Sequence, residues 1–385
     1  MNSPDRWIRR DTLLALVFLV LSVGIYFLPT GFEANIQPNA VRCRGRVVSV
    51  DNSQIQQMGM VKSGDQGVTL RLLDGPFEGR TVQGSNPLLG QMDRDKIFRP
   101  GDDALVVLSL DENGEVIFVN PQAHYRLGLE VLLLSLFALL LIAYGGWTGI
   151  KSLLSFLLAA LVLWKLLVPA LLKGWHPVFI SLALVAFLSA AIIFLVAGLN
   201  RKGLVAFLGA FLGVLTSCAM AVIFTQAFHI HGAVMPFAET LLYSGFGHLN
   251  LSQVYIAAVF IASSGAVMDL AMDVAASMNE VAAQHPDIGR RALVQSGFNV
   301  GRAVVGTMTT TLLLAYSGGY ITLLMAFMAQ GVPLVNTFNF IYVAAEILKT
   351  IVGSFGLVTV APFTALVGGL ILAPAGAPVP LAKKR

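Results

Sequence analysis

Polar and charged residues interrupt two long apolar segments of this sequence, at positions where a lipid bilayer would penalise them. The first segment carries Asp269, Asp273 and Glu280, and the spacings of four and seven residues place the three carboxylates on one face of a helix. Carboxylates on one helix face suit a hard cation or a proton relay. The alternative is that a helix over residues 251–285 outruns the bilayer, so that some of these acids lie at the cytoplasmic interface. Asp269 and Asp273 are therefore candidates for a solute or ion pathway, and Glu280 is a secondary candidate.

The second segment places five small or polar residues along one helix face at steps of three or four residues: Ser296, Asn299, Arg302, Gly306 and Thr310. A charge near the centre of a spanning helix costs about 2.5–3.5 kcal/mol on insertion scales, and such a residue usually faces a cavity or a counter-ion. We therefore add Asn299, Arg302 and Thr310 to the candidate pathway.

The two segments are predicted to form an antiparallel hairpin that turns at residues 285–289. Counted from Asp287, Arg302 is 15 residues away, Asp273 is 14 and Asp269 is 18. These residues should reach a similar depth, so we expect Arg302 to face the interior of the bundle with the two acids as counter-ions. Such a cluster is either a transport site or a structural clasp, and the sequence leaves both open.

Other polar residues are secondary candidates. Glu346 and Lys349 have i,i+3 spacing in a further apolar run, and a mutual ion pair is the competing explanation. Four residues near one outer loop could bind a metal: His229, His231, Glu239 and His248. Their spacing fits no zinc signature, so we interpret the histidines as loop residues at the membrane interface. Walker, dinucleotide-binding, HExxH and GxSxG motifs are absent from the sequence. We therefore expect no cofactor and no ATP-driven transport by this chain alone, an enzymatic activity is the least favoured function, and the metal question stays open.

The composition indicates a multi-pass membrane protein. Hydrophobic residues make up 56% of the 385 residues and charged residues 12%, and the mean hydropathy is +0.77. Soluble domains carry about 25% charged residues. Basic residues cluster where apolar runs end, at 201–202, 290–291 and 383–385, which is the positive-inside pattern and predicts that both termini are cytoplasmic. The expected partner is the lipid bilayer rather than nucleic acid.

One long polar segment, residues 36–121, follows an N-terminal membrane anchor at residues 1–35. Apolar residues alternate there in five short runs, at 45–50, 68–73, 79–83, 103–110 and 115–119. Turn signals separate the runs, among them Pro100-Gly101-Asp102 and Glu112-Asn113-Gly114. Five short strands predict a small β-barrel of OB or SH3-like kind outside the cytoplasm, which serves as a cap or assembly surface or binds a ligand.

The remainder is predicted to be a helical transmembrane domain, residues 122–378, followed by a basic cytoplasmic tail, residues 379–385. About 20 apolar residues cross a bilayer core, and the candidate spans are 127–149, 150–170, 177–198, 203–226, 251–273, 292–316, 336–353 and 355–374. The short run at 319–331 ends in Gly331-Val332-Pro333. It is either a span or one half of a re-entrant hairpin with 336–353.

Three stretches resemble the YibE/F-like family of bacterial multi-pass membrane proteins: SSGAVMDLAMDVAASMNEV (263–281), SGFNVGRAVVGTMTTTLLLAYSGG (296–319) and AAEILKTIVGSFGLVTVAPFTAL (344–366). The likeness extends over nearly the whole chain, including an anchor followed by an extracytoplasmic segment. The sequence departs from the family pattern at Ala303 and Thr310, where the family has an acid and an asparagine. The resemblance implies a protein of the bacterial inner membrane and a permease function, and it does not indicate which substrate is moved.

Three functions compete. The first is a transporter or channel that moves a small polar or charged solute, an ion among the candidates, through a site on residues 260–316. The second is an intramembrane scaffold or assembly factor whose outer β-domain binds a partner and whose charges are structural clasps. The third, an intramembrane enzyme, needs a nucleophile–base pair or a bound metal, and no such spacing is visible. Further copies of the chain, as a homo-oligomer, are an additional candidate partner.

Overall fold

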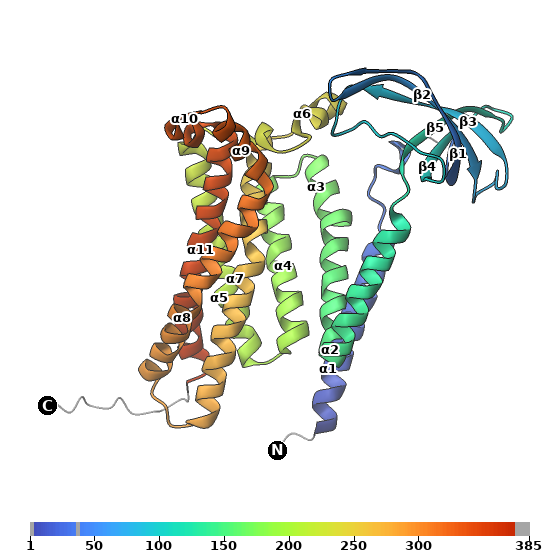
Figure 1. Cartoon of the computed structure of the whole chain (residues 1–385). Coiled ribbons are helices and arrows are strands. Elements are labelled where there is room, and N and C mark those ends of the chain that lie inside the picture. The colour runs from blue at the N-terminus through green and yellow to red at the C-terminus, as the bar shows by residue number, and fades with distance from the viewer. Residues whose placement is uncertain (1–3, 36–38, 374–385) are drawn as a thin grey trace. The chain divides into compact units, whose positions relative to one another are not determined.

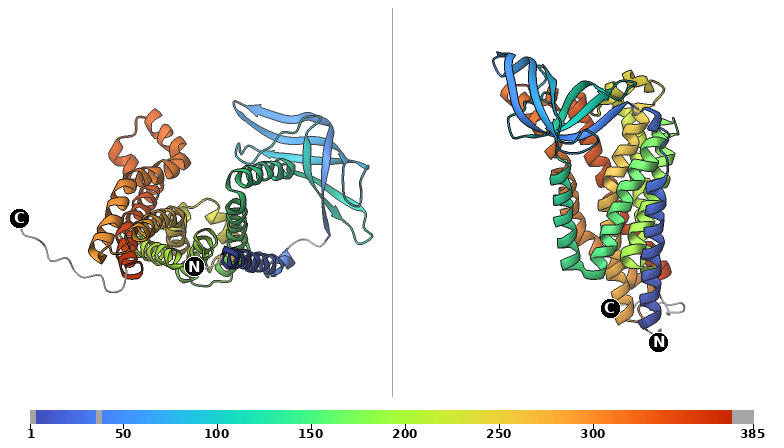
Figure 2. Two further views of the ribbon diagram at one scale, coloured as in Figure 1. Left: turned by 90° about the horizontal axis from the view of Figure 1, so that it is seen from below. Right: turned by 90° about the vertical axis from the view of Figure 1, so that its right-hand side faces the viewer.

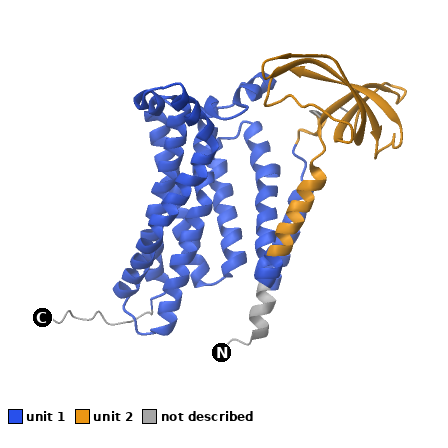
Figure 3. Ribbon diagram, viewed as in Figure 1, with its two compact units in different colours: residues 1–30, 141–385 blue, residues 31–140 orange. Residues whose placement is uncertain are grey.

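The computed structural model of the chain, seen from three sides in Figures 1 and 2, describes residues 4–35 and 39–373. The predicted tail at 379–385 lies outside these residues. The chain forms two compact units, residues 1–30 with 141–385 and residues 31–140, which Figure 3 draws in different colours. The second unit carries all the strands of the described chain, and the first carries most of the helices.

A five-stranded sheet forms the β-domain. Its strands are β1 (Ala40–Met58), β2 (Val61–Leu72), β3 (Thr81–Leu89), β4 (Asp103–Leu110) and β5 (Val116–His124). They are hydrogen-bonded in the order β3-β2-β1-β4-β5, and all neighbouring strands are antiparallel. Each of the five predicted runs lies within or overlaps one strand. Gly101 and Gly114, in two of the predicted turns, have the positive φ angles of 95° and 81° that such turns require.

The sheet curls into a nearly closed barrel because β1 is long and bulged. β1 pairs with β4 through residues 40–46 and with β2 through residues 45–58, and its register shifts after Val47 and after Asp51. Bulges increase the local twist, which brings the edge strands together. A Cβ atom on Gly84 in β3 would lie 2.8 Å from the carbonyl oxygen of Val119 in β5. The barrel encloses a fully buried apolar core that includes Leu70, Leu72, Phe98, Val106 and Leu108.

Two buried amides fasten the connection between β3 and β4 to the sheet. The Gln66 side chain accepts a hydrogen bond from the Phe98 N–H at 2.9 Å and donates one to the Phe98 carbonyl at 3.0 Å. Asn86 donates to Gln66 at 3.1 Å and to the Lys96 carbonyl at 2.7 Å. Both amides are fully buried. They satisfy backbone groups that would otherwise be unpaired inside the barrel, which lets Phe98 fill the core.

Among the described residues, six helical segments are long and apolar enough to cross a membrane, which indicates a membrane protein. Four of them are single helices: α4 (Pro177–Ala197), α5 (Arg201–Ala227), α7 (Leu251–Gln284) and α11 (Ile341–Ile371). The other two are α2 (Leu127–Val162), which continues through a π-helical turn into α3 (Val168–Leu172), and α8 (Arg290–Ser317), which continues through a 3-10 turn into α9 (Ile321–Ala329). The remaining α-helices are α1 (Pro4–Phe27), α6 (Ala238–Leu241) and α10 (Leu334–Asn339).

A break at Gly146 divides α2. Gly146 has non-helical angles, φ 51° and ψ −127°, and a Cβ atom on Gly149 would lie 2.2 Å from the Leu141 carbonyl oxygen, so the chain bends sharply here. The 46 residues of Leu127–Leu172 would span about 69 Å as one straight helix, which is far more than a bilayer core of about 30 Å. The break is close to the predicted boundary between the spans 127–149 and 150–170.

The prediction of separate spans at 336–353 and 355–374 is wrong. α10 ends at Asn339, and α11 then runs from Ile341 to Ile371 without interruption. Gly353, near the predicted boundary, lies inside α11, where its Cβ position is 3.0 Å from the Cβ of Ser263 in α7. This glycine allows close helix packing rather than a turn. Residues 319–331, for which the sequence left a span and a re-entrant half-helix open, end in α9, which continues α8, and residues 336–353 are divided between α10 and α11.

The largest core of the helical unit lies between α5, α7, α8 and α11, with α4 against α5 and α7. Small residues set the close spacing of these helices. A Cβ atom on Gly213 of α5 would lie 2.8 Å from Val267 of α7 and 2.9 Å from Val360 of α11. Close van der Waals packing of this kind holds apolar helices together. α7 and α8 are thereby fixed on the rest of the bundle.

Candidate functional site

The outer side of α7 carries the three predicted acids. Between residues 262 and 280, α7 exposes six residues at steps of three or four: Ala262, Gly265, Asp269, Asp273, Ala276 and Glu280. At about 100° per residue, these fall within about 80° of one another around the helix. The other sides of α7 contact α4, α5, α8 and α11. The three carboxylates therefore share one face, as their spacing predicted, and we name these six residues the α7 acidic face.

A polar stripe runs along the outer side of α8. We name it the α8 polar face, and it consists of Gln295, Asn299, Arg302, Gly306 and Thr310, all exposed. Gln295 Nε2 donates to Asn299 Oδ1 at 3.1 Å, and the Thr310 hydroxyl donates to the Gly306 carbonyl at 3.1 Å. Ser296, predicted on this face, is half-buried, and Gln295 takes its place.

The predicted orientation of Arg302 is wrong. Arg302, Asp269 and Asp273 are all exposed on the surface of the chain rather than directed into the bundle. Within the part of the chain that the structure describes, Arg302 forms no ion pair with either aspartate. The single chain therefore does not form the clasp that the sequence allowed.

Glycines on the opposite side of α8 explain this orientation. A Cβ atom on Gly297 would lie 2.8 Å from the Cβ of Ala365, and one on Gly301 would lie 2.5 Å from the Cβ of Ala361, both in α11. These contacts hold the glycine side of α8 against α11. Arg302 follows Gly301 at about 100° around the helix, so it points away from this contact.

The two faces hold their charges at a similar depth. Asp273 lies 11 residues before the end of α7 at Gln284, and Arg302 lies 12 residues after the start of α8 at Arg290. At 1.5 Å per residue, these positions are about 17 and 18 Å along their helices from the connecting turn. Asp273 and Arg302 are thus level with each other on the outer surfaces of their helices, and they form no ion pair with each other within the described chain.

Glu346 and Lys349 form the ion pair that their spacing predicted, with 2.5 Å between Lys349 Nζ and Glu346 Oε2. Two tyrosines that sequence reasoning missed lie beside this pair. The Lys349 ammonium is 5.1 Å from the centre of the Tyr316 ring, and the Tyr255 hydroxyl donates to the Ala345 carbonyl at 2.6 Å. The tyrosines come from α8 and α7, so no local spacing in the sequence could have linked them to Glu346.

The loop histidines do not gather into a metal site. His231 and His248 line one open pocket of about 530 Å³, and His248 Nε2 is 3.2 Å from the Leu172 carbonyl oxygen. Across residues 4–35 and 39–373, no group of three or more His, Cys, Asp or Glu side chains is arranged to hold a metal ion.

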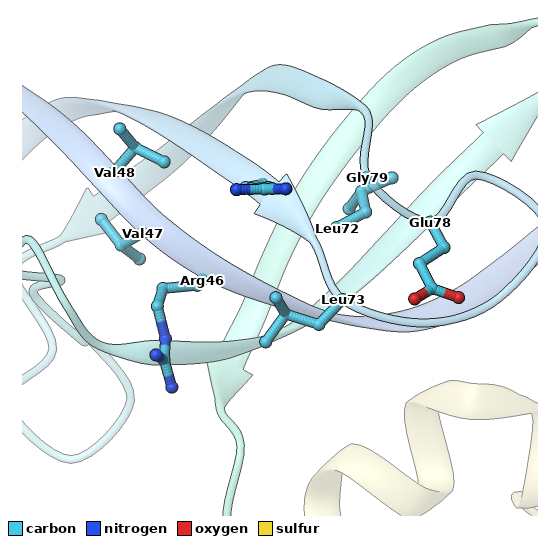
Figure 4. Close-up of a pocket in the computed structure, with 8 residues that line it drawn as sticks. Arg46, Val47, Val48, Leu72, Leu73, Glu78 and Gly79 are labelled. Carbon is cyan, nitrogen blue, oxygen red and sulfur yellow. The ribbon is translucent and has the colours of Figure 1, made fainter.

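The β-domain has a pocket of its own, of about 420 Å³, lined by residues of β1, of β2 and of the segment that follows β2 (Figure 4). Figure 4 shows Arg46 and Glu78 on either side of Leu73. Arg71 also lines the pocket, and it stands opposite Arg46 in the β1–β2 register. Sequence reasoning missed this site, although the alternation of arginines at 42, 44 and 46 was a signal that they share one side of a strand.

Arg46 and Arg71 repel each other because like charges stand opposite on neighbouring strands, and Asp103 offsets this repulsion. Its carboxylate accepts hydrogen bonds from Arg46 Nε at 2.9 Å and from Arg44 Nη2 at 2.5 Å. The hydrogen bond from Arg46, with that from Arg44, holds the pKa of Asp103 below its usual range. Arg71 and Glu78 are left as the charged groups of the pocket that form no ion pair with Asp103, so the pocket presents one cation and one anion.

A family model described as YibE/F-like protein matches residues 133–374, which is more than half of the chain. The chain belongs to the YibE/F-like family. This confirms the resemblance seen in the sequence, but the match is narrower than the expected likeness over nearly the whole chain. It contains the α7 acidic face and the α8 polar face and leaves out α1 and the β-domain. Comparisons with curated proteins and with solved structures gave no match.

Proposed function

We propose that this member of the YibE/F-like family is a multi-pass protein of the bacterial cytoplasmic membrane that moves a small polar or charged solute, an ion among the candidates. The pathway runs along the α7 acidic face and the α8 polar face, and its residues are Asp269, Asp273, Asn299, Arg302 and Thr310. One observation carries the proposal: these residues are exposed on helices long enough to cross a bilayer, and no ion pair in the described chain neutralises them.

Each charge held against lipid tails would cost about 2.5–3.5 kcal/mol on insertion scales. Water, a solute or another protein surface must therefore cover the two faces. A dry clasp would need one acid for one arginine, whereas the α7 acidic face brings two aspartates close to the level of Arg302. The surplus carboxylate, the amide and the hydroxyl are groups that a hydrated pathway would keep solvated.

The proposed topology places both termini in the cytoplasm and the β-domain outside. The crossings are α1, the two parts of α2 on either side of Gly146, α4, α5, α7, α8 and α11. Their number is even, so the chain ends on the side on which it starts. The connections at residues 198–200 and 285–289 then lie in the cytoplasm beside the basic pairs at 201–202 and 290–291, in agreement with the positive-inside rule.

Cysteine labelling tests this topology. A cysteine at Asn113 should react with a membrane-impermeant maleimide in sealed cells, and one at Asp287 should react only after permeabilisation. The native thiols should contribute little background, because Cys43 and Cys218 are both buried. Burial also raises the pKa of Cys43 to about 11, which keeps its thiol protonated. Labelling in the reverse order would refute the topology.

Reconstituted flux tests the pathway. Purified protein in proteoliposomes would be screened with labelled ions, metabolites and metals. We expect Asp269→Asn and Arg302→Ala each to reduce the flux by about tenfold or more, which corresponds to about 1.4 kcal/mol of lost interaction. The matched control is Asp287→Asn, the same change at an exposed acid in the connecting turn, which should leave the flux unchanged. No flux across the panel, or flux that all three variants retain, would contradict the proposal.

A second candidate function, that of an assembly factor, is favoured by one apolar site on the β-domain. Ile117 and Phe118 of β5 are 69% and 53% exposed. With Val82 of β3 they line a pocket of about 440 Å³ between the two edge strands. Exposed apolar side chains beside strand edges are a surface that a protein partner can cover. If Ile117→Ser with Phe118→Ser abolishes the cellular phenotype and Asp269→Asn preserves it, the assembly function should replace the transport function.

A further inference from the structure

The α7 acidic face and the α8 polar face are complementary in charge. The first presents Asp269 and Asp273, and the second presents Arg302 close to the same depth. Each face also has room for another helix. No atom of the chain outside the local helix lies within 4 Å of the Cβ position of Gly265 on α7 or of Gly306 on α8. Small residues such as these allow spanning helices to approach closely.

The two faces do not pair within one chain, because the contacts of Gly297 and Gly301 with α11 turn Arg302 outward. A second copy in the same membrane orientation has the residues needed to cover both faces. Its Arg302 lies at the depth of the first copy's Asp273, since both depths are set by the distance from the same α7–α8 turn. Charge complementarity and equal depth therefore identify the occupant of these faces as another copy of the chain.

We propose that two copies of the chain associate side by side in the membrane, with the α8 polar face of each on the α7 acidic face of the other. Such an interface is isologous, so Arg302 of each copy pairs with Asp273 of the other. The inference rests on the proposed function and deepens it, because the pathway becomes a site shared by two copies. Asp269 is then the carboxylate left over for the solute.

A charge exchange between copies tests this pairing. Full-length protein carrying two different tags is co-expressed in one membrane, and the fraction of one tag recovered with the other is measured. Arg302→Asp alone places acid against acid in a symmetric pair, and Asp273→Arg alone places base against base. We expect each single variant to reduce co-recovery by about tenfold or more, because juxtaposed like charges strongly disfavour association. Asp287→Arg, in the exposed turn, is the matched control and should not change it.

Co-expression of the two single variants is the decisive arm. A mixed pair restores both contacts. The two substituted positions meet with opposite charges on one side of the pair, and the native Arg302 and Asp273 meet on the other. Co-recovery of the differently tagged variants should therefore return to the wild-type level. Pairing within one chain predicts the opposite, since each variant chain would remain mispaired whatever its neighbour. Failure of the mixed pair to recover overturns the inference, as does wild-type protein that shows no co-recovery.

Cross-linking provides a second measurement that does not depend on charge. One tagged copy carries Ala276→Cys on the α7 acidic face, and the other carries Asn299→Cys on the α8 polar face. These positions lie 8 residues before the end of α7 and 9 residues after the start of α8, so they are level. A thiol cross-linker should join the two tagged copies. When the Asn299→Cys copy is exchanged for a copy with Val358→Cys, an exposed position on α11, no cross-link should form. Equal cross-linking at Val358 overturns the inference. Both readouts report assembly rather than flux, so the inference and the proposed transport function fail separately.

Discussion

Replacement of Gly301 by alanine should destabilise the helical unit, whereas the same replacement of Gly306 should not. The added Cβ at Gly301 would lie 2.5 Å from the Cβ of Ala361, and alanine has no rotamer that could relieve the contact. Carbon atoms pack at about 3.5–4.0 Å, so α8 and α11 would have to separate by about 1–1.5 Å. At Gly306, no atom outside the local helix lies within 4 Å of the added carbon.

The magnitude follows from the rigidity of the neighbour. Overpacking a well-packed core costs about 1–3 kcal/mol, and the upper part of that range, about 2–3 kcal/mol, applies where only backbone movement can relieve the contact. Alanine is a better helix former than glycine by about 0.8–1.0 kcal/mol. This gain is common to both variants, so it cancels from their difference. Gly301→Ala should therefore be about 2–3 kcal/mol less stable than Gly306→Ala, a difference of about 4–6 °C in Tm at about 2 °C per kcal/mol.

Thermal melts of both variants in dilute detergent, followed by the loss of the monodisperse size-exclusion peak, measure this difference. Dilution keeps any association between copies out of the comparison. Equal melting temperatures would refute the assignment of Gly301 to the inner side of α8. A lower melting temperature for Gly306→Ala would mean that α8 is rotated by roughly half a turn. Either result would also contradict the exposed position of Arg302, because the rotation of α8 about its own axis sets the orientation of both Gly301 and Arg302.

Two further predictions concern the β-domain. In residues 39–124 expressed alone, Gln66→Met should lower the free energy of unfolding by about 2–6 kcal/mol, because two buried Phe98 backbone groups each lose a partner at about 1–3 kcal/mol. Urea titration followed by circular dichroism measures this, and an equal effect of Gln56→Met, at an exposed position, would contradict it. Asp103→Asn should have a lower Tm than the wild type at pH 7. The difference between the two Tm values should become smaller below about pH 4, near the ordinary aspartate pKa. The folded pKa of Asp103 is lowered, first by the hydrogen bond from Arg46, so its stabilisation is present above the unfolded pKa and is lost as the pH falls through the folded value. A difference between the two Tm values that stays constant from pH 7 to pH 3 would show that the charge of the Asp103 carboxylate does not contribute to the stability of the β-domain.

The β-domain and the acids of α7 could be predicted from sequence because each depends on a local period. Alternation of apolar residues indicated five strands, and glycines in the turns marked their ends. Asp269, Asp273 and Glu280 share a face because helical geometry alone requires it. These features need no knowledge of what the element contacts, so tertiary packing could not change them.

The orientation of α8 could not be predicted in this way. Two rules compete along this helix: polar residues of a spanning helix should face the protein, and small residues should face a neighbouring helix. Gly301 and Arg302 are consecutive, so both rules cannot hold for one contact. The structure follows the glycines, which fit against Ala361 and Ala365 of α11. The boundary predicted between the spans 336–353 and 355–374 failed for a related reason, because Gly353 lies inside α11 as a packing contact with Ser263.

The charge balance of the two faces bears on the solute. Each chain has Asp269, Asp273 and Arg302 near one depth, which leaves one excess negative charge when both acids are ionised. Pairing between two copies would neutralise one acid for each arginine and would not change this excess. Low-dielectric surroundings make an uncompensated carboxylate costly, so it must either bind a proton or attract a cation. A pathway along these faces should therefore favour cations or protons over anions, and should lose that preference when Asp269, the surplus acid, is made neutral.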